Sequence, residues 1–259
     1  MPFPKVEHVK YKKQPLDNVI CQIRFPPILK IETEVPANFQ DRIKSQYSEL
    51  SEKQEFIFNL QMRNALKEEI QEPFSSTIKN YEFISDDNIW KLNLTRNFLS
   101  LSTKQYTNWE DFKTRFKFAF NNFNDVYQPS LFTRVGLRYT DVIVRSKLDL
   151  GTTDWKELIN PSLLGILTSP YKDNVLQSES AFEIRLQDNE SILRVVTRIV
   201  RSADSEEPSF IIDSDFFSTK KSHKENALDK LEYFHASASG LFRWCITEKL
   251  HIAMEPEKL

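Results

Sequence analysis

The chain has 259 residues, enough to bury the core of one large domain or of two halves that share an interface. Its 35 Lys and Arg and 37 Asp and Glu leave a formal charge of −2, so no overall basic field draws the chain to nucleic acid or to an anionic membrane. Only four Gly exclude most glycine-rich phosphate loops, and twenty Phe argue against disorder.

Residues 1–17 show no periodic pattern and carry the basic stretch "KYKK" between prolines, so we expect an extended basic arm that orders against a partner. From Val19 to Phe25, apolar and polar residues alternate strictly, which predicts a strand with one buried face. Pro26 and Pro27 then remove two backbone donors and end the strand. A helix is expected over residues 36–48.

Residues 51–79 combine an alternating stretch with a helical composition, and we leave this region unassigned. Three strands follow and predict an antiparallel meander over residues 81–85, 89–95 and 98–103. Thr107 and Glu110 then have the spacing of a capping box, and aromatic residues recur behind them every three or four positions. This pattern predicts a long helix that ends before Pro129.

The second part of the chain repeats this plan. We expect a strand over residues 132–144, a helix over 154–167, strands over 181–187, 192–200 and 209–217, and a helix that begins with a capping box at Ser222 and Glu225 and runs to about Trp244. The strand motif around Arg24 matches the motif around Arg138, 114 positions later. We therefore infer a tandem duplication of a strand, helix, three-strand, helix unit.

The duplication predicts two halves, residues 18–128 and 129–259, that together form one globular unit. Such a unit gives an α+β fold in which long helices pack on one face of an antiparallel sheet. The expected arrangement has a pseudo-two-fold axis, like that of the TATA-binding protein or of a helix-grip fold.

Three segments of the chain carry a resemblance to a known family: "PLDNVICQIRFPPIL", "NWEDFKTRFKFAFNNFNDVYQPSLFTRVGLRYTDVI" and "FHASASGLFRWCIT". The chain resembles the sporadically distributed family of bacterial proteins of similar length and unknown function. The resemblance covers nearly the whole chain, and the "RVGLRYTDVI" block is its most specific part. It implies a bacterial origin and patchy inheritance, as is typical of accessory genes such as phage-defence components, and it implies no catalytic residues.

Enzyme chemistry finds little support in the sequence. The four His are scattered without metal-ligand spacing, so we expect no metal site and no cofactor. Asp213 and Asp215 project from one strand face, as a pair that divides acid and base roles would, although a solvated strand face is the favoured interpretation. Ser237 and Ser239 lack the GxSxG motif of a nucleophile, and small residues late in a helix usually allow close packing. We expect no enzyme, and a hydrolase that uses the Asp pair is the least favoured alternative.

Binding chemistry is better represented, because arginines recur on the duplicated strands. The candidate binding residues are Arg24, Arg134, Arg138, Tyr139, Asp141 and Arg145, with Arg194, Arg198 and Arg201 from a third strand. If the duplicated strands lie together, these guanidinium groups converge on an acidic peptide, a phosphate or a nucleic-acid backbone. The competing interpretation, which we favour, is cross-strand ion pairing with Glu183, Asp141 or Glu190.

Two classes of function remain open at this point. The first is a non-catalytic recognition or adaptor protein, as in the sensor subunit of a phage-defence system with a co-encoded protein partner. The second is a small-ligand or nucleic-acid binder that uses the arginine face, with nucleic acid the less favoured partner. Self-association is left open. Cys21 and Cys245 lie far apart without a CxxC motif, and no apolar run reaches the ~18 residues of a membrane span, so we expect reduced thiols and a cytoplasmic protein.

Overall fold

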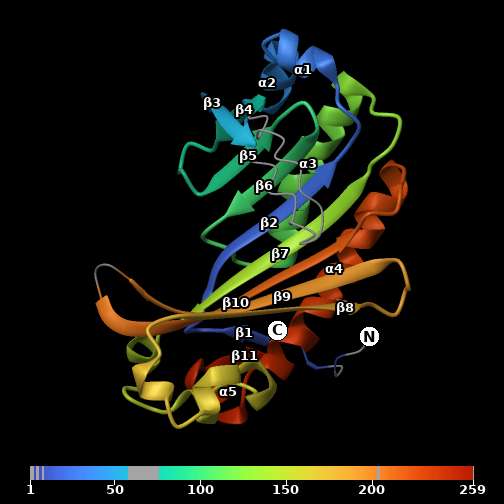
Figure 1. Cartoon of the computed structure of the whole chain (residues 1–259). Coiled ribbons are helices and arrows are strands. Elements are labelled where there is room, and N and C mark those ends of the chain that lie inside the picture. The colour runs from blue at the N-terminus through green and yellow to red at the C-terminus, as the bar shows by residue number, and fades with distance from the viewer. Residues whose placement is uncertain (1–2, 4–5, 8, 58–75, 203–204, 259) are drawn as a thin grey trace, which may run out of the picture.

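The computed structural model describes residues 3, 6–7, 9–57, 76–202 and 205–258. Its main element is a nine-stranded antiparallel sheet, and the two long helices α3 and α4 lie on one side of it (Figure 1). The predicted α+β class is therefore confirmed. In the part of the chain that the structure describes, no helix is long and apolar enough to cross a membrane.

The first part of the chain supplies five strands of the large sheet. Its elements are β1 (Val9–Tyr11), β2 (Leu16–Arg24), α1 (Leu29–Thr33), α2 (Ala37–Ile43), β3 (Glu49–Ile57), β4 (Ser76–Ile84), β5 (Trp90–Leu94), β6 (Phe98–Thr103) and α3 (Trp109–Tyr127). The alternating residues of β2 bury one face as predicted, with Val19, Cys21 and Ile23 almost inaccessible to solvent. The predicted meander is confirmed as β4, β5 and β6.

The second part of the chain supplies the other four strands. Its elements are β7 (Arg134–Ile143), the short 3₁₀ helices η1 (Arg145–Leu148), η2 (Trp155–Glu157), η3 (Pro161–Leu163), η4 (Gly165–Thr168) and η5 (Lys172–Asn174), then β8 (Ser178–Arg185), β9 (Ser191–Ser202), β10 (Ser205–Ser218), α4 (Lys224–Cys245), α5 (Glu248–Ala253) and β11 (Pro256–Lys258). β8, β9 and β10 form the second predicted meander, and β10 pairs with β7.

The order of the large sheet is β3-β4-β5-β6-β2-β7-β10-β9-β8. β2 and β7 are therefore neighbours at its centre, with β6, β5 and β4 on one side and β10, β9 and β8 on the other. Gln22 and Gly136 face each other across the central pair. Arg24 and Arg138 each lie two residues from this facing pair, in opposite directions along the sheet.

Several predicted helical features are wrong in detail. The helix expected over residues 154–167 is replaced by η2, η3 and η4, because Pro161 cannot donate a backbone hydrogen bond and Gly165 adopts a positive φ of 48°. The helix expected over 36–48 is shorter, and α1 precedes it. In the region left unassigned, β3 and β4 include residues 51–57 and 76–79, and the rest lies outside the described residues.

The two expected capping boxes do not form either. The N-cap of α3 is Asn108, whose side chain accepts a hydrogen bond from the backbone N–H of Asp111. Asn is a stronger N-cap residue than Thr, so it displaces Thr107 from this role. The N-cap of α4 is His223, which makes no side-chain cap hydrogen bond.

The aromatic stripe of α3 forms core as its spacing predicts. Trp109, Phe112, Phe116, Phe120 and Phe123 are all buried. They pack with the buried face of the sheet, as in the contact between Phe123 and Phe25, whose ring centres are 4.7 Å apart. The helix face of the sheet is thus the hydrophobic side, which leaves the opposite face for polar residues.

The N-terminal segment, expected as an arm for a partner, lies against the chain's own C-terminal elements. β1 pairs with β11 in a separate two-stranded sheet. The Tyr11 hydroxyl is 2.8 Å from Nδ1 of His251 on α5. This arrangement places Tyr11 of β1 against Phe242 of α4, with ring centres 5.9 Å apart.

Candidate functional site

The predicted site residues do not gather in one place. We call the face of the sheet opposite the helices the open face. Because side chains alternate along β7, Arg134 and Arg138 lie on this open face, while Tyr139 and Asp141 lie on the helix face. Arg24 joins the first group from β2. Arg145 belongs to neither group: its Nη1 donates to the backbone oxygen of Thr153 at 2.8 Å, and its guanidinium lies 4.6 Å from the Trp155 ring centre. Arg145 therefore braces the loop after β7.

On the open face, the arginines pair with the two aspartates that had been considered as a catalytic pair. Arg134 donates from Nη2 to both carboxylate oxygens of Asp215, at 2.9 and 2.8 Å. Arg138 makes a two-pronged contact with Asp213, with 2.6 Å between Nε and Oδ1, and Arg198 approaches the same carboxylate at 3.4 Å. The favoured ion-pairing interpretation had named different acids, namely Glu183, Asp141 and Glu190; of these, Glu183 lies 4.0 Å from Arg194.

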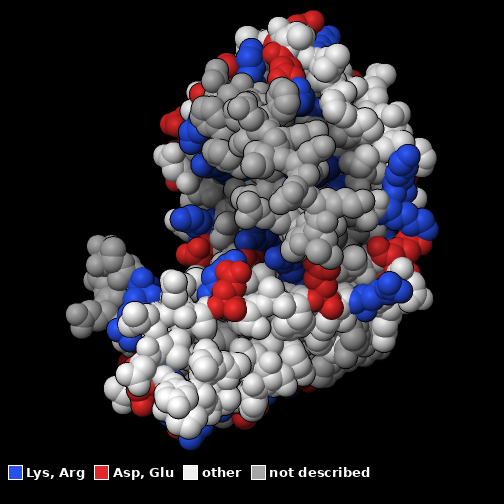
Figure 2. Space-filling model, viewed as in Figure 1, with Lys and Arg blue, Asp and Glu red and all other residues white. Residues whose placement is uncertain are grey.

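Arg24 is the exception on this face. Its Nε donates to Gln22 at 2.9 Å, and among the described residues it has no carboxylate partner. It stands directly opposite Arg134 in the strand register. Partial burial lowers the pKa of Arg24, and the neighbouring Arg134 lowers it further. Figure 2 shows acidic and basic side chains interspersed on the side of the molecule in view, without a large surface of one sign.

The helix face of the sheet holds a cleft. A cleft of about 1020 Å³ opens between the N-terminal segment, the loop before α3 and α4, and we call it the α4 cleft. Its floor is the sheet itself, where Tyr139 and Asp141 of β7 lie beside Ser214 and Phe216 of β10. Tyr139 and Asp141, which were both predicted as site residues, therefore line the cleft, whereas the predicted arginines of β7 do not.

One wall of the α4 cleft is an aromatic and polar chain of contacts centred on His235. The His235 ring stacks on Trp109, with ring centres 4.4 Å apart and planes 7° apart. Its Nδ1 is 3.0 Å from the Tyr139 hydroxyl. Trp109 in turn donates from Nε1 to Glu232 at 2.7 Å, and Lys113 lies 2.8 Å from the same carboxylate. These contacts hold the wall in one arrangement.

The opposite wall comes from the N-terminal segment and the end of α4. Tyr11 contacts His251 through its hydroxyl and packs edge-on against Phe242, with ring centres 5.9 Å apart. Arg243 reaches the cleft too, but its guanidinium is paired with Glu248. The positive charge of Arg243 is thus already balanced.

Asp141 is the unusual group in this cleft. Its side chain is buried, with 8 % of the residue exposed, and in the described part of the chain it makes no hydrogen bond or ion pair. Burial alone raises the pKa of this carboxyl to about 7. A buried carboxyl without a donor is costly to the fold, so its position on a cleft floor indicates a role for an external donor.

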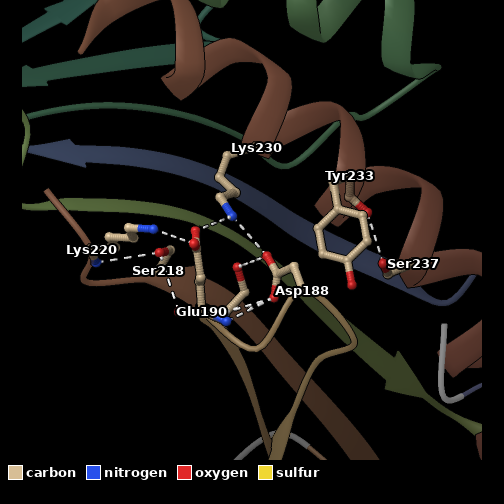
Figure 3. Close-up of polar contacts among 8 residues, drawn as sticks. Asp188, Glu190, Ser218, Lys220, Lys230, Tyr233 and Ser237 are labelled. Carbon is tan, nitrogen blue, oxygen red and sulfur yellow. Dashed lines mark hydrogen bonds and ion pairs between the residues drawn. The ribbon is translucent and has the colours of Figure 1, made fainter. Parts of the chain in front are cut away.

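A second, smaller hollow of about 370 Å³ lies near the start of α4. Figure 3 shows a network of paired charges in it: Lys230 lies 2.7 Å from Asp188 and 3.3 Å from Glu190, which also pairs with Lys220. Burial raises the pKa of Asp188, but hydrogen bonds from Lys230 and Ser191 outweigh it and hold the pKa at about 2. This cluster has the character of a structural network.

The sequence contained a signal for the α4 cleft that we interpreted differently. The small residues of "HASAS" predict close packing, and Ser237 is indeed buried, with its hydroxyl bonded to the Tyr233 backbone oxygen. Ala238 and Ser239, however, line the cleft. Their small size leaves the space that the cleft occupies.

No group of three or more His, Cys, Asp or Glu is arranged to hold a metal ion within the ranges that the structure describes. Comparisons with models of protein families, with curated proteins and with solved structures found no match. The geometry of the site is therefore the basis for its functional interpretation.

Proposed function

We propose that this chain is a non-catalytic recognition protein that binds a small organic ligand in the α4 cleft. The observation that carries the proposal is Asp141, a buried carboxyl with no partner among the described residues on the floor of a cleft of about 1020 Å³. Ligand sites in proteins are typically concave and largely apolar, with a few polar groups that orient the ligand. The α4 cleft has this composition.

The arginine face is a weaker candidate for the same role. Arg134 and Arg138 are bound by Asp215 and Asp213, so an incoming anion has to compete with two carboxylates already in place. Arg24, in contrast to these two, has no carboxylate partner among the described residues. Cross-strand ion pairs of this kind brace a sheet, which explains these residues without a ligand.

Binding rather than catalysis is supported by the way the cleft's reactive groups are engaged. The His235 ring is stacked on Trp109, and its Nδ1 contacts Tyr139. Neither cysteine lines the cleft, and burial raises the thiol pKa of Cys21 and of Cys245, which lowers the reactivity of both as nucleophiles. No nucleophile, base and orienting group converge in the described part of the cleft.

The proposed protein is also an internally duplicated, cytoplasmic protein with a role in phage defence. The strand order on either side of the β2–β7 pair supports a duplication of residues 18–128 and 129–259, with a pseudo-two-fold axis near Gln22 and Gly136. The buried free thiols of Cys21 and Cys245 support a cytoplasmic protein. Together with the family resemblance, this favours a sensor subunit of a phage-defence system that reports ligand binding to a co-encoded protein.

The test is a cleft-filling substitution with a matched control. Ala238→Trp places a large ring in the α4 cleft, whereas Ala181→Trp adds the same ring to exposed strand β8. Small molecules extracted from bacterial cells are selected on each purified protein and identified by mass spectrometry. We expect ligands that bind the unmodified protein and Ala181→Trp but not Ala238→Trp. Ligands that survive Ala238→Trp and are lost in Arg24→Ala or Arg138→Ala would move the site to the arginine face.

A further inference from the structure

We infer that the ligand of the α4 cleft is an organic cation, an ammonium or amidinium group on an aromatic or apolar body, with its charged nitrogen on Asp141. This inference rests on the proposed function of the cleft and adds the chemical class of the ligand. Three features support a cationic ligand: the charges around Asp141, the aromatic walls of the cleft, and the proton that Asp141 must release when a cation binds.

Among the described residues, no cation forms an ion pair or hydrogen bond with Asp141. Tyr139 on its own strand, Tyr11 on β1 and Cys245 on α4 lie near enough to interact with its charge. The cleft is also lined by Lys10 on β1, His235 and Arg243 on α4, and His251 on α5. Arg243 is paired with Glu248, and the described groups next to Asp141 are phenols, a thiol and imidazoles already in contact with tyrosines. A positively charged N–H donor therefore supplies what this carboxylate lacks.

The other charges of the cleft discourage an anionic ligand. Glu110 and Glu232 line it on the side of Trp109, and Glu7 and Lys10 lie on the N-terminal segment. A phosphate or carboxylate placed on the floor would meet Asp141, and of the described cations that line the cleft, Arg243 is already paired with Glu248 and Lys10 belongs to the N-terminal segment. Repulsion between like charges in a buried site opposes binding strongly.

The walls suit the rest of such a ligand. Tyr11, Tyr106, Trp109, Tyr139 and Phe242 all line the cleft. Aromatic faces attract ammonium groups through their negative π clouds and also stack on flat rings. An arylalkylamine or a similar cation satisfies both the carboxylate and the aromatic walls.

The inference fixes the direction of a pH effect. Because burial raises the pKa of Asp141 to about 7, the empty cleft holds a protonated carboxyl in part of the molecules at neutral pH. A cation binds the ionised form, so its binding releases a proton and its affinity rises from pH 6 to pH 8. A ligand that accepts a hydrogen bond from the protonated carboxyl shows the opposite trend.

The experiment uses three probes of matched shape: tryptamine as the cation, tryptophol as the neutral analogue and indole-3-propionate as the anion. Binding to the full chain is measured by calorimetry and ligand-observed NMR at pH 6 and pH 8. We expect tryptamine to bind at pH 8 about tenfold more tightly than tryptophol, and about five- to tenfold more tightly than at pH 6. Asp141→Asn should abolish both differences.

Two variants make the result specific. Asp213→Asn removes an equally buried carboxyl from the open face, and it should leave tryptamine binding unchanged. Ala238→Trp should remove binding of every probe that occupies the cleft. Tryptophol or indole-3-propionate binding that is sensitive to Ala238→Trp but not to Asp141→Asn would overturn the cation and leave the proposed function intact. Absence of tryptamine binding would also overturn the cation, whereas extracted ligands insensitive to Ala238→Trp would overturn the proposed function itself.

Discussion

The guanidinium group of Arg134 occupies the space above Gly136 where a β-carbon would otherwise stand. This close approach lets Arg134 reach Asp215 on β10 and Gln22 on β2 at the same time. The same guanidinium lies 5.0 Å from the ring centre of Phe217. Gly136 thus provides the room for a side chain that links three central strands of the sheet.

Gly136→Ala should displace Arg134 and break its contacts with Asp215. We expect the free energy of unfolding to fall by about 1–2 kcal/mol, measured by urea denaturation. In an Arg134→Ala background the same substitution should be nearly neutral, because the space is then empty. Equal costs of Gly136→Ala in both backgrounds would show that the β-carbon meets another obstacle.

Asp141 should make stability depend on pH in an unusual direction. Burial raises the pKa of Asp141 from 3.8 to about 7, so the folded state holds this proton more tightly than the unfolded state. The resulting stabilisation is complete below about pH 4 and is lost as pH rises through about 7. Relative to the unmodified protein, Asp141→Asn should therefore become more stable as pH rises from 4 to 8, by up to ~4 kcal/mol. Asp213→Asn is the control, and it should destabilise because it leaves Arg138 unpaired.

The contact between Tyr11 and His251 should open in acid. Burial lowers the pKa of His251 below 6.5, with a smaller contribution from Arg243, so the fold favours the neutral ring. The stability from the neutral ring is complete above about pH 6.5 and is lost as pH falls through the lower folded value. Hydrogen exchange of β1, corrected for intrinsic rates, should be faster at pH 5 than at pH 7. Tyr11→Phe should give fast exchange at both pH values, and a strong pH effect in that variant would contradict the assignment.

The aromatic stripe of α3 offers a matched comparison. Phe120 is completely buried, whereas Phe118 on the same helix is only partly buried. Phe120→Ala, and equally Phe116→Ala, should cost ~3–5 kcal/mol, because each leaves a cavity in the core. Phe118→Ala should cost clearly less. Thermal and urea denaturation measure the difference, and similar losses at Phe118 and Phe120 would mean that Phe118 is covered by another surface.

The local part of the fold follows from the sequence because its causes are local. The alternating pattern of Val19, Cys21 and Ile23 alone predicts the buried face of β2. The spacing of Phe116 and Phe120 predicts α3. Helix ends are harder to predict, since Thr107 and Asn108 are neighbouring N-cap residues and the stronger one, Asn108, takes the cap position. Over residues 154–167 the apolar spacing resembled a helix, but Pro161 and Gly165 divide it into 3₁₀ turns.

The sequence predicted only part of the candidate site, because the residues that form the site are far apart in the chain and meet only in the folded structure. Asp141 was selected for its place near Arg138, yet three positions along a strand put the two side chains on opposite faces. The residues that form the cleft around Asp141 include Tyr11, Trp109 and His235, which come from three distant segments of the chain. A periodic pattern in the sequence does not report such a long-range contact, and Tyr11 reaches the cleft through the pairing of β1 with β11 and its contact with His251.

The pairing of β1 with β11 also affects the order in which parts of the protein fold. β1 and β11 are joined by almost the whole length of the chain, so one wall of the α4 cleft depends on a contact of very high sequence separation. Closing so large a loop costs entropy that only the assembled sheet and α4 can offset. Residues 9–11 are synthesised before residues 256–258, so β1 has no strand partner until β11 has been made. We therefore expect this wall of the α4 cleft to form only after β11 is available to pair with β1.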